Sequence, residues 1–121
     1  MNKKKVVFLG SKNIGLECLK ILYDHQYKLN YEIIGVLTNT KSENIQKYSA
    51  KNNLKILKSL NEFLNLDKVH ITISVQYHEI LNINCIKKAQ DLAINLHMAP
   101  LPEYRGCNQF SIAIIENKRI F

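Results

Sequence analysis

Two polar residues two positions apart, Asn95 and His97, carry the strongest chemical signal in the sequence. They lie at the end of a predicted strand over residues 92–96, and residues i and i+2 of an extended chain face the same way. An asparagine amide can hydrogen-bond a carbonyl oxygen as it becomes an oxyanion. An imidazole beside it can take the proton that an attacking amine loses. The pair therefore indicates acyl transfer, although on spacing alone a histidine at a strand end more often has a structural role.

A loop containing the only two prolines of the chain, Pro100 and Pro102, follows this pair. Proline fixes the backbone φ angle, so the two residues would hold the loop rigid and aim Arg105 at the site. A helix is expected after the loop, over residues 108–117, because its large apolar residues are consistent with one buried helical face.

A second polar stretch follows the buried strand predicted over residues 70–75. Its members are Gln76, Tyr77, His78, Glu79, Ile80 and Leu81. Backbone N–H and C=O groups of such a loop can pair with a flat heterocycle at the carboxyl end of a strand. An ordinary connection between a strand and a helix explains the same residues equally well.

The first predicted turn between a strand and a helix is Gly10–Gly15, with the spacing G-x-x-x-x-G. This spacing matches neither the dinucleotide-binding pattern nor the P-loop, because Leu16 stands where the P-loop has lysine. Thr38 and Asn39 end the next strand, where an NAD-binding fold has an acid. A helix N-terminus nevertheless attracts anions. The candidates to hold a substrate phosphate are Ser11, Lys12 and Asn13, although a tight turn is the commoner function of such a sequence.

Composition excludes several classes of protein. The 121 residues fit one domain, and a hydrophobic share of 46% suffices for a packed core. The 17 basic residues exceed the 10 acidic ones, for a net charge of +7, but only Arg105 and Arg119 are arginines. Dispersed lysines usually make a solvated surface, so nucleic-acid binding is the less favoured interpretation.

The same arguments predict a cytoplasmic protein without a membrane segment or a metal. The apolar run at residues 6–9 is too short for a signal peptide, and no run approaches the length of a membrane span. Cys18, Cys85 and Cys107 are odd in number and widely spaced, which argues against disulfides and against a zinc site. The four histidines show no metal-ligand spacing.

Short β-rich runs alternate with helical stretches along the chain. Strands are expected at residues 6–9, 31–37, 54–57, 70–75 and 92–96, and helices at about 14–22, 43–51, 59–64, 80–88 and 108–117. Ser59 and Glu62 form the pattern of a capping box at the start of one helix. This alternation predicts an α/β fold, a Rossmann-like doubly wound and mostly parallel sheet. Ligand sites in such sheets lie at the carboxyl ends of the strands, where the strand order reverses.

The motifs resemble those of the formyltransferases that use 10-formyltetrahydrofolate, a family that includes methionyl-tRNA formyltransferase, glycinamide ribonucleotide transformylase and the sugar N-formyltransferases. The likeness spans essentially the whole chain. It is carried by the strand and turn at residues 6–11, the loop at 74–81, and Asn95-x-His97 followed by the Pro-Leu-Pro-x-Tyr-Arg-Gly run that starts at Pro100. The resemblance implies that Asn95 and His97 are catalytic and that Gln76–Leu81 receive the pterin of the formyl donor, 10-formyltetrahydrofolate.

The family also has a catalytic aspartate in a later strand, beyond residue 121. The final Ile120-Phe121 reads as the start of another strand. We therefore expect residues 1–121 to be an incomplete N-terminal catalytic domain, truncated on its C-terminal side. A homodimer of the full-length protein is an arrangement that the resemblance leaves open.

The resemblance also bears on the acceptor amine. Met98-Ala99-Pro100-Leu101 stands where the tRNA enzymes have a Gly-Ser-Leu-Leu-like run. This difference favours an enzyme that formylates an amino-dideoxy sugar linked to a nucleotide, for lipopolysaccharide O-antigen or a similar surface polysaccharide. Methionyl-tRNA formyltransferase is the alternative, and an inactive remnant that at most binds folate is an alternative of another class. The residues expected to bind the acceptor are Ser11, Lys12, Asn13, Arg105 and Asn108.

Overall fold

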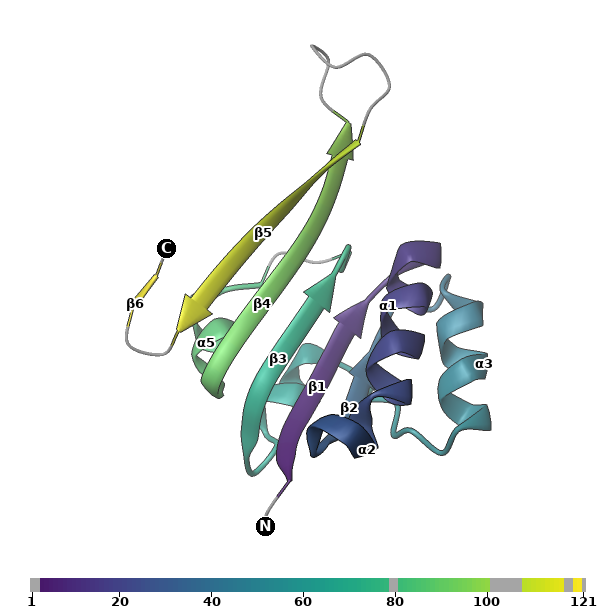
Figure 1. Cartoon of the computed structure of the whole chain (residues 1–121), viewed down its shortest axis with the longest axis horizontal. Helices are drawn as coiled ribbons and strands as arrows, with labels where there is room; N and C mark the ends of the chain where they lie inside the picture. Colours follow the sequence, from purple (N-terminus) through teal and green to yellow (C-terminus); the bar gives the residue numbers. More distant parts are fainter. Residues whose placement is uncertain (1–2, 79–80, 101–107, 117–118, 121) are drawn as a thin grey trace.

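The computed structural model describes residues 3–78, 81–100, 108–116 and 119–120, and from His97 onward it describes the backbone alone. Six strands form one sheet in the order β2-β1-β3-β4-β5-β6 (Figure 1). Their bounds are β1 Lys4–Gly10, β2 Tyr31–Leu37, β3 Val69–Val75, β4 Ala89–Pro100, β5 Asn108–Glu116 and β6 Arg119–Ile120. The first four strands are parallel, and β5 and β6 pair antiparallel. The prediction of a mostly parallel, doubly wound sheet is confirmed.

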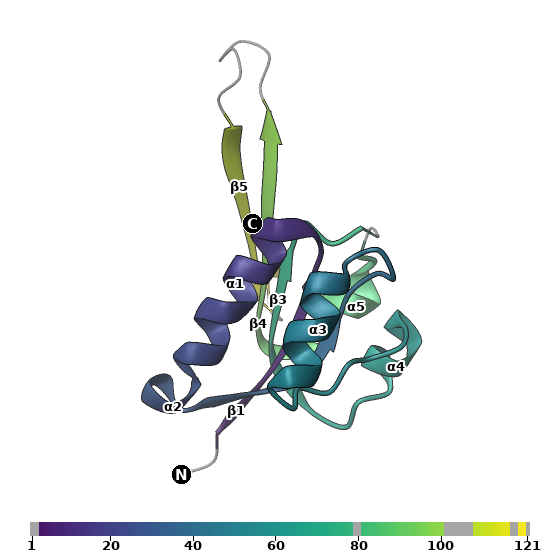
Figure 2. The same cartoon turned by 90° about the vertical axis from the view of Figure 1, so that its right-hand side faces the viewer.

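Helices cover both faces of the parallel part of the sheet. They are α1 Lys12–Asp24, α2 Gln26–Leu29, α3 Glu43–Lys51, α4 Leu60–Leu64 and α5 Ile83–Lys87. Residues of α1 and α3 pack in the same core cluster, and residues of α4 and α5 pack in the other. Figure 2 shows α1 on one side of the sheet and α4 and α5 on the other. Crossover connections of this kind are what parallel strands require.

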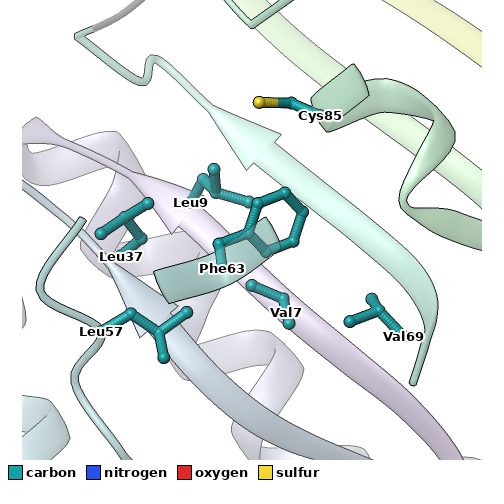
Figure 3. Packing of buried hydrophobic residues seen from close by; sticks show 7 residues of the cluster. All are labelled: Val7, Leu9, Leu37, Leu57, Phe63, Val69 and Cys85. Carbon is teal, nitrogen blue, oxygen red and sulfur yellow. The ribbon is translucent and has the colours of Figure 1, made fainter. Parts of the chain in front are cut away.

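The middle of β1 shows why helices must cover both faces of the sheet. Val6, Val7, Phe8 and Leu9 are all at most 2% exposed. Successive residues of a strand point to opposite faces, and Phe8 packs in one core cluster while Val7 and Leu9 pack in another. The second cluster also contains Phe63 of α4 (Figure 3). A continuous apolar run is therefore the correct sequence signature for this strand.

The strand order reverses between β1 and β3. From β1 the chain moves outward to β2, then returns to place β3 on the other side of β1 and continues to β4. Leu9 pairs with Leu37 of β2 on one side and with Ser74 of β3 on the other. The loops that leave the carboxyl ends of β1 and β3 consequently flank the point where doubly wound sheets bind ligands.

Three local predictions have different outcomes in the structure. Ser59 is the N-cap of α4 as predicted, and its Oγ accepts a hydrogen bond from the Glu62 N–H at 3.2 Å. The reciprocal bond differs from a strict capping box, because Glu62 Oε1 accepts from the N–H of Lys58, the residue before the N-cap, at 2.6 Å. The expected strand at residues 54–57 is reduced to one parallel bridge, between Val36 and Ile56. The helix expected over residues 80–88 is shorter and begins at Ile83.

The helix expected over residues 108–117 is wrong for this structure, in which Asn108–Glu116 form strand β5. Phe110, Ile112 and Ile114 recur at every second position, and the smaller residues Ser111 and Ala113 stand between them. This period of two fits a strand as well as the helix that we expected. Pairing with β4 also extends that strand to Pro100, where we expected a loop.

The described part of the chain contains neither a membrane-spanning helix nor a metal-binding cluster of side chains. No helix in this part of the chain is long and apolar enough to cross a membrane. Among the same residues, no three His, Cys, Asp or Glu side chains gather in a way that could hold a metal ion.

Candidate functional site

Backbone hydrogen bonds join three segments at the carboxyl edge of the sheet. The Ser11 N–H, just after β1, donates to the Val75 carbonyl at 3.2 Å, and the Gln76 N–H, just after β3, donates to the Leu96 carbonyl of β4 at 3.1 Å. The turn after β1, the loop after β3 and the end of β4 therefore lie side by side. Most of the residues that the sequence predicts to be functional lie in these three segments.

Asn95 and His97 both lie within β4, so the spacing of two on which their pairing rests falls inside one strand. Asn95 pairs with Ser74 of β3 and is half-buried. The His97 backbone pairs with Ser111 of β5. The Leu96 carbonyl that holds Gln76 lies between the two residues in the sequence, so the loop after β3 starts directly beside them.

The loop after β3 turns sharply and is anchored on the core. Gln76 has a φ of 50°, the left-handed conformation that non-glycine residues adopt rarely and mostly at functional or tight turns. The Tyr77 and His78 rings meet with centroids 4.4 Å apart and planes at 60°. Tyr77 and Leu81 pack against the core cluster of Phe63, so part of this loop is structural. Glu79 and Ile80 lie outside the described residues.

The turn after β1 combines a buried hydroxyl with an exposed cation. Ser11 is the N-cap residue of α1 and is 1% exposed, yet its side chain makes no capping hydrogen bond. Lys12 is exposed and has a φ of 66°, and Asn13 Oδ1 accepts a hydrogen bond from Asn44 Nδ2 at 3.0 Å. The positive end of the helix dipole and the exposed Lys12 make this turn suitable for an anion.

Gly15 shows that the same turn also has a packing role. A Cβ at this position would lie 3.3 Å from Ile45 Cδ1 of α3 and 3.4 Å from the Gly10 carbonyl carbon. The absence of a side chain lets α1 approach both the end of β1 and α3. The tight-turn interpretation and the anion-binding interpretation are therefore compatible.

Residues that sequence reasoning did not propose complete this edge. Thr38, Asn39 and Ser42 follow β2, which pairs with β1, and the Ser42 hydroxyl accepts a hydrogen bond from the Lys12 N–H at 3.4 Å. The sequence feature that could have indicated these residues is the polar run that follows the buried strand β2. Of the remaining candidates, Arg105 lies outside the described residues, and Asn108 is the first residue of β5, its backbone paired with Pro100.

The cysteines that the structure describes do not supply a nucleophile. Burial raises the pKa of the Cys18 thiol, and the neighbouring Glu17 carboxylate raises it further. The thiolate is the reactive form of cysteine, so both effects make Cys18 less reactive. Cys85 is a residue of α5 and is buried in the core cluster that contains Phe63. Neither of the two cysteines in the described part of the chain is therefore suited to act as a nucleophile.

No protein-family model matches the sequence. The chain is 30% identical over 136 residues to methionyl-tRNA formyltransferase of Sulfurihydrogenibium sp. (strain YO3AOP1), covering 94% of this chain and 41% of that protein. It is 26% identical to the bifunctional polymyxin resistance protein ArnA of Wigglesworthia glossinidia brevipalpis, covering 88% of this chain and 17% of that protein. The chain spans about two fifths of the length of the methionyl-tRNA formyltransferases that it matches.

Solved structures share the fold at low sequence identity. A formyltetrahydrofolate deformylase from Pseudomonas putida superposes with a TM-score of 0.64 and 14% identity over 96% of this chain and 49% of that one. A 4-N formyltransferase from Francisella tularensis gives a TM-score of 0.61 and 13% identity over 93% of this chain and 50% of that one. The chain is homologous to formyltransferase enzymes and has a formyltransferase-like α/β fold.

Proposed function

We propose that this chain carries the donor-binding and catalytic part of an enzyme that transfers a formyl group from 10-formyltetrahydrofolate to an amine. The observation that carries the proposal is the hydrogen bond from the Gln76 N–H to the Leu96 carbonyl. It starts the Gln76–Leu81 loop, the proposed pterin site, beside the strand that contains Asn95 and His97. Homology to formyltransferase enzymes supports this assignment.

The proposed residues divide the reaction between them. The acceptor nitrogen attacks the formyl carbon of the donor, and the Asn95 amide donates a hydrogen bond to the formyl oxygen as negative charge develops there. His97 takes the proton that the acceptor nitrogen loses. The bond between the formyl carbon and N10 then breaks, N10 takes a proton, and tetrahydrofolate leaves. No metal is needed in this scheme.

For the acceptor, we propose methionyl-tRNA. The sequence relatives support this acceptor better than the amino sugar that the Met98–Leu101 run favours. Relatives from Sulfurihydrogenibium and Clostridioides difficile, at 30% and 26% identity, are both methionyl-tRNA formyltransferases.

A nucleotide-linked amino sugar is the second candidate. It is favoured by the Met98–Leu101 sequence and by the shared fold with a 4-N formyltransferase. Both acceptors carry phosphates, so the exposed Lys12 at the N-terminus of α1 suits either of them. With Ser11, Asn13, Arg105 and Asn108 it makes up the proposed acceptor-binding set.

The test uses the full-length protein with 10-formyltetrahydrofolate and each acceptor in turn. We expect release of tetrahydrofolate with methionyl-tRNA, and mass spectrometry should find the formyl group on the methionine amine. Transfer only to dTDP-4-amino-4,6-dideoxyglucose would instead establish the second candidate. Failure with both acceptors, in a protein that still binds the donor, would contradict the proposed enzyme and support the folate-binding remnant.

A further inference from the structure

A buried serine lies beside Asn95 on the neighbouring strand. Ser74 of β3 is 2% exposed and is the register partner of Asn95 in β4, which runs parallel to β3 (Figure 1). Adjacent strands lie about 4.8 Å apart, and register partners in a parallel pair point to the same face of the sheet. The Ser74 hydroxyl and the Asn95 carboxamide are therefore close enough to share a hydrogen bond.

The residues around Ser74 leave its hydroxyl one side chain that can accept a hydrogen bond. On the other side Ser74 pairs with Leu9 of β1, which is apolar. Thr72, two residues earlier on the same face of β3, has an Oγ1 atom without a partner, so the two hydroxyls are not bonded to each other. Since buried hydroxyls normally have a hydrogen-bond partner, Asn95 is the partner that the strand register provides.

The Asn95 carboxamide has two unlike ends, and the proposed reaction needs one of them to face the substrate. Nδ2 donates hydrogen bonds, whereas Oδ1 only accepts them. The developing oxyanion requires Nδ2, because a reversed amide would turn Oδ1 toward the negative charge. The other register partner of Asn95 is Ala113 of β5, and alanine has no side-chain donor. A hydroxyl that donates to Oδ1 from the Ser74 side would select the productive orientation.

The structure shows no hydrogen bond between these two side chains, both of which it describes. Hydrogen bonds of an active site are often misaligned until the substrate binds. We propose that Ser74 is a positioning residue: with the formyl donor bound, its hydroxyl donates to Asn95 Oδ1 and so turns Nδ2 toward the formyl oxygen. This role rests on the proposed function, because it acts through Asn95.

A double-mutant cycle in the full-length protein tests the role, with whichever of the two acceptors the protein uses. Ser74→Ala should lower the single-turnover rate of formyl transfer about fivefold to tenfold, the change that one neutral hydrogen bond supplies. In the Asn95→Ala background the same substitution should alter the rate by less than about twofold, because the residue that Ser74 positions is absent. The Kd of a folate analogue should be the same with and without Ser74→Ala.

Conservative variants separate the hydroxyl from packing. Ser74→Thr keeps a hydroxyl donor and should retain the native rate to within about twofold, whereas Ser74→Cys should resemble Ser74→Ala because a thiol donates weakly. Thr72→Val is the matched control. Thr72 is also buried on this face of β3, but it pairs with Ala93, which has no side-chain acceptor. This variant should leave the rate unchanged.

Nitrogen-15 relaxation of the Asn95 side-chain amide gives a readout that does not require formyl transfer. With a folate analogue bound, the order parameter of Nδ2 should be high in the native protein and in Ser74→Thr, and lower in Ser74→Ala. An equal loss of rate from Ser74→Ala with and without Asn95, or an undiminished order parameter in Ser74→Ala, would overturn the role of Ser74 alone. A native protein that binds the analogue but transfers no formyl group would overturn the proposed function as well.

Discussion

Asn95 is the proposed catalytic residue whose environment is described most fully. It is half-buried in β4 and pairs with Ser74 of β3. The next residue, Leu96, accepts the hydrogen bond from the Gln76 N–H at the start of the loop after β3. Asn95→Ala should lower kcat by about 10²–10³-fold, the loss typical of one oxyanion donor. His97→Ala should lower it by about 10²-fold or more, as expected for a general base. Single-turnover assays of the full-length protein measure both effects.

Donor affinity separates this role from a structural one. Fluorescence titration with a folate analogue should give nearly the same Kd for Asn95→Ala as for the native protein, because the amide acts only on the developing oxyanion. Asn61→Ala, at an exposed position on α4, should change neither quantity. Normal turnover in Asn95→Ala would remove Asn95 from the mechanism.

At the opposite edge of the sheet, a salt bridge predicts a small dependence of stability on pH. Lys4 Nζ lies 2.7 Å from Asp91 Oδ2, and this hydrogen bond holds the pKa of Asp91 below its ordinary value of 3.8. A carboxylate with a lowered pKa in the folded state contributes stability above its unfolded pKa, and the contribution is lost as the pH falls through the folded pKa. Because Asp91 is 41% exposed, the contribution is below about 1 kcal/mol.

Urea unfolding of Asp91→Asn at pH 7 and at pH 2 tests this expectation. The variant should be slightly less stable than the native protein at pH 7, and the difference should shrink as the pH falls toward 2, because protonation of Asp91 progressively removes the ion pair. Asp67→Asn, in which no salt bridge among the described residues is lost, is the control. A constant difference at both values of pH would mean that the ion pair is not its cause.

Among the helices, α4 depends most clearly on its first turn. It has five residues, too few for a stable isolated helix, so its cap and the buried Phe63 must hold it. Ser59→Ala removes the acceptor of the Glu62 N–H and should cost about 1 kcal/mol of unfolding free energy. Ser59→Asp keeps an acceptor at the N-cap and should retain most of the stability. Equal losses in the two variants would show that the cap contributes little.

The same capping residues show why some elements could be predicted from the sequence. Ser59 and Glu62 interact within one turn, and the apolar run in β1 has few alternatives to a buried strand, so local sequence determines both. Residues 108–116 carry a pattern that fits either a helix or a strand, and pairing with β4 makes them a strand here. Tertiary contacts decide such cases, because local propensity is a weak constraint.

In the candidate site, too, some residues could be predicted from the sequence and others could not. The ends of β1, β3 and β4 follow from strand order, so the sequence could locate Ser11, Gln76 and Asn95. The Thr38 and Asn39 side-chain oxygens are buried without a hydrogen-bond partner, which no spacing in the sequence reveals. Burial of single atoms depends on tertiary packing, so only the structure shows it.

The sheet as a whole should have its most stable region at β1. This strand is paired on both sides, by β2 and β3, and its residues 6–9 are covered on both faces. By contrast, the four-residue helix α2 buries none of its residues. Amides with buried surroundings open only with global unfolding, whereas those in poorly packed segments open locally.

Native-state hydrogen exchange of the full-length protein should therefore give the slowest rates at the amides of Val6–Leu9. The α2 amides should exchange faster by several orders of magnitude, because their opening exposes little apolar surface. Binding of a folate analogue should slow exchange at Gln76 and Tyr77, while the rates in α2 change little. If the β1 amides exchanged as fast as those of α2, the doubly covered strand would not be the centre of stability. If the analogue protected the turn after β1 and left Gln76 unchanged, the pterin would bind beside Ser11 instead of at the loop after β3.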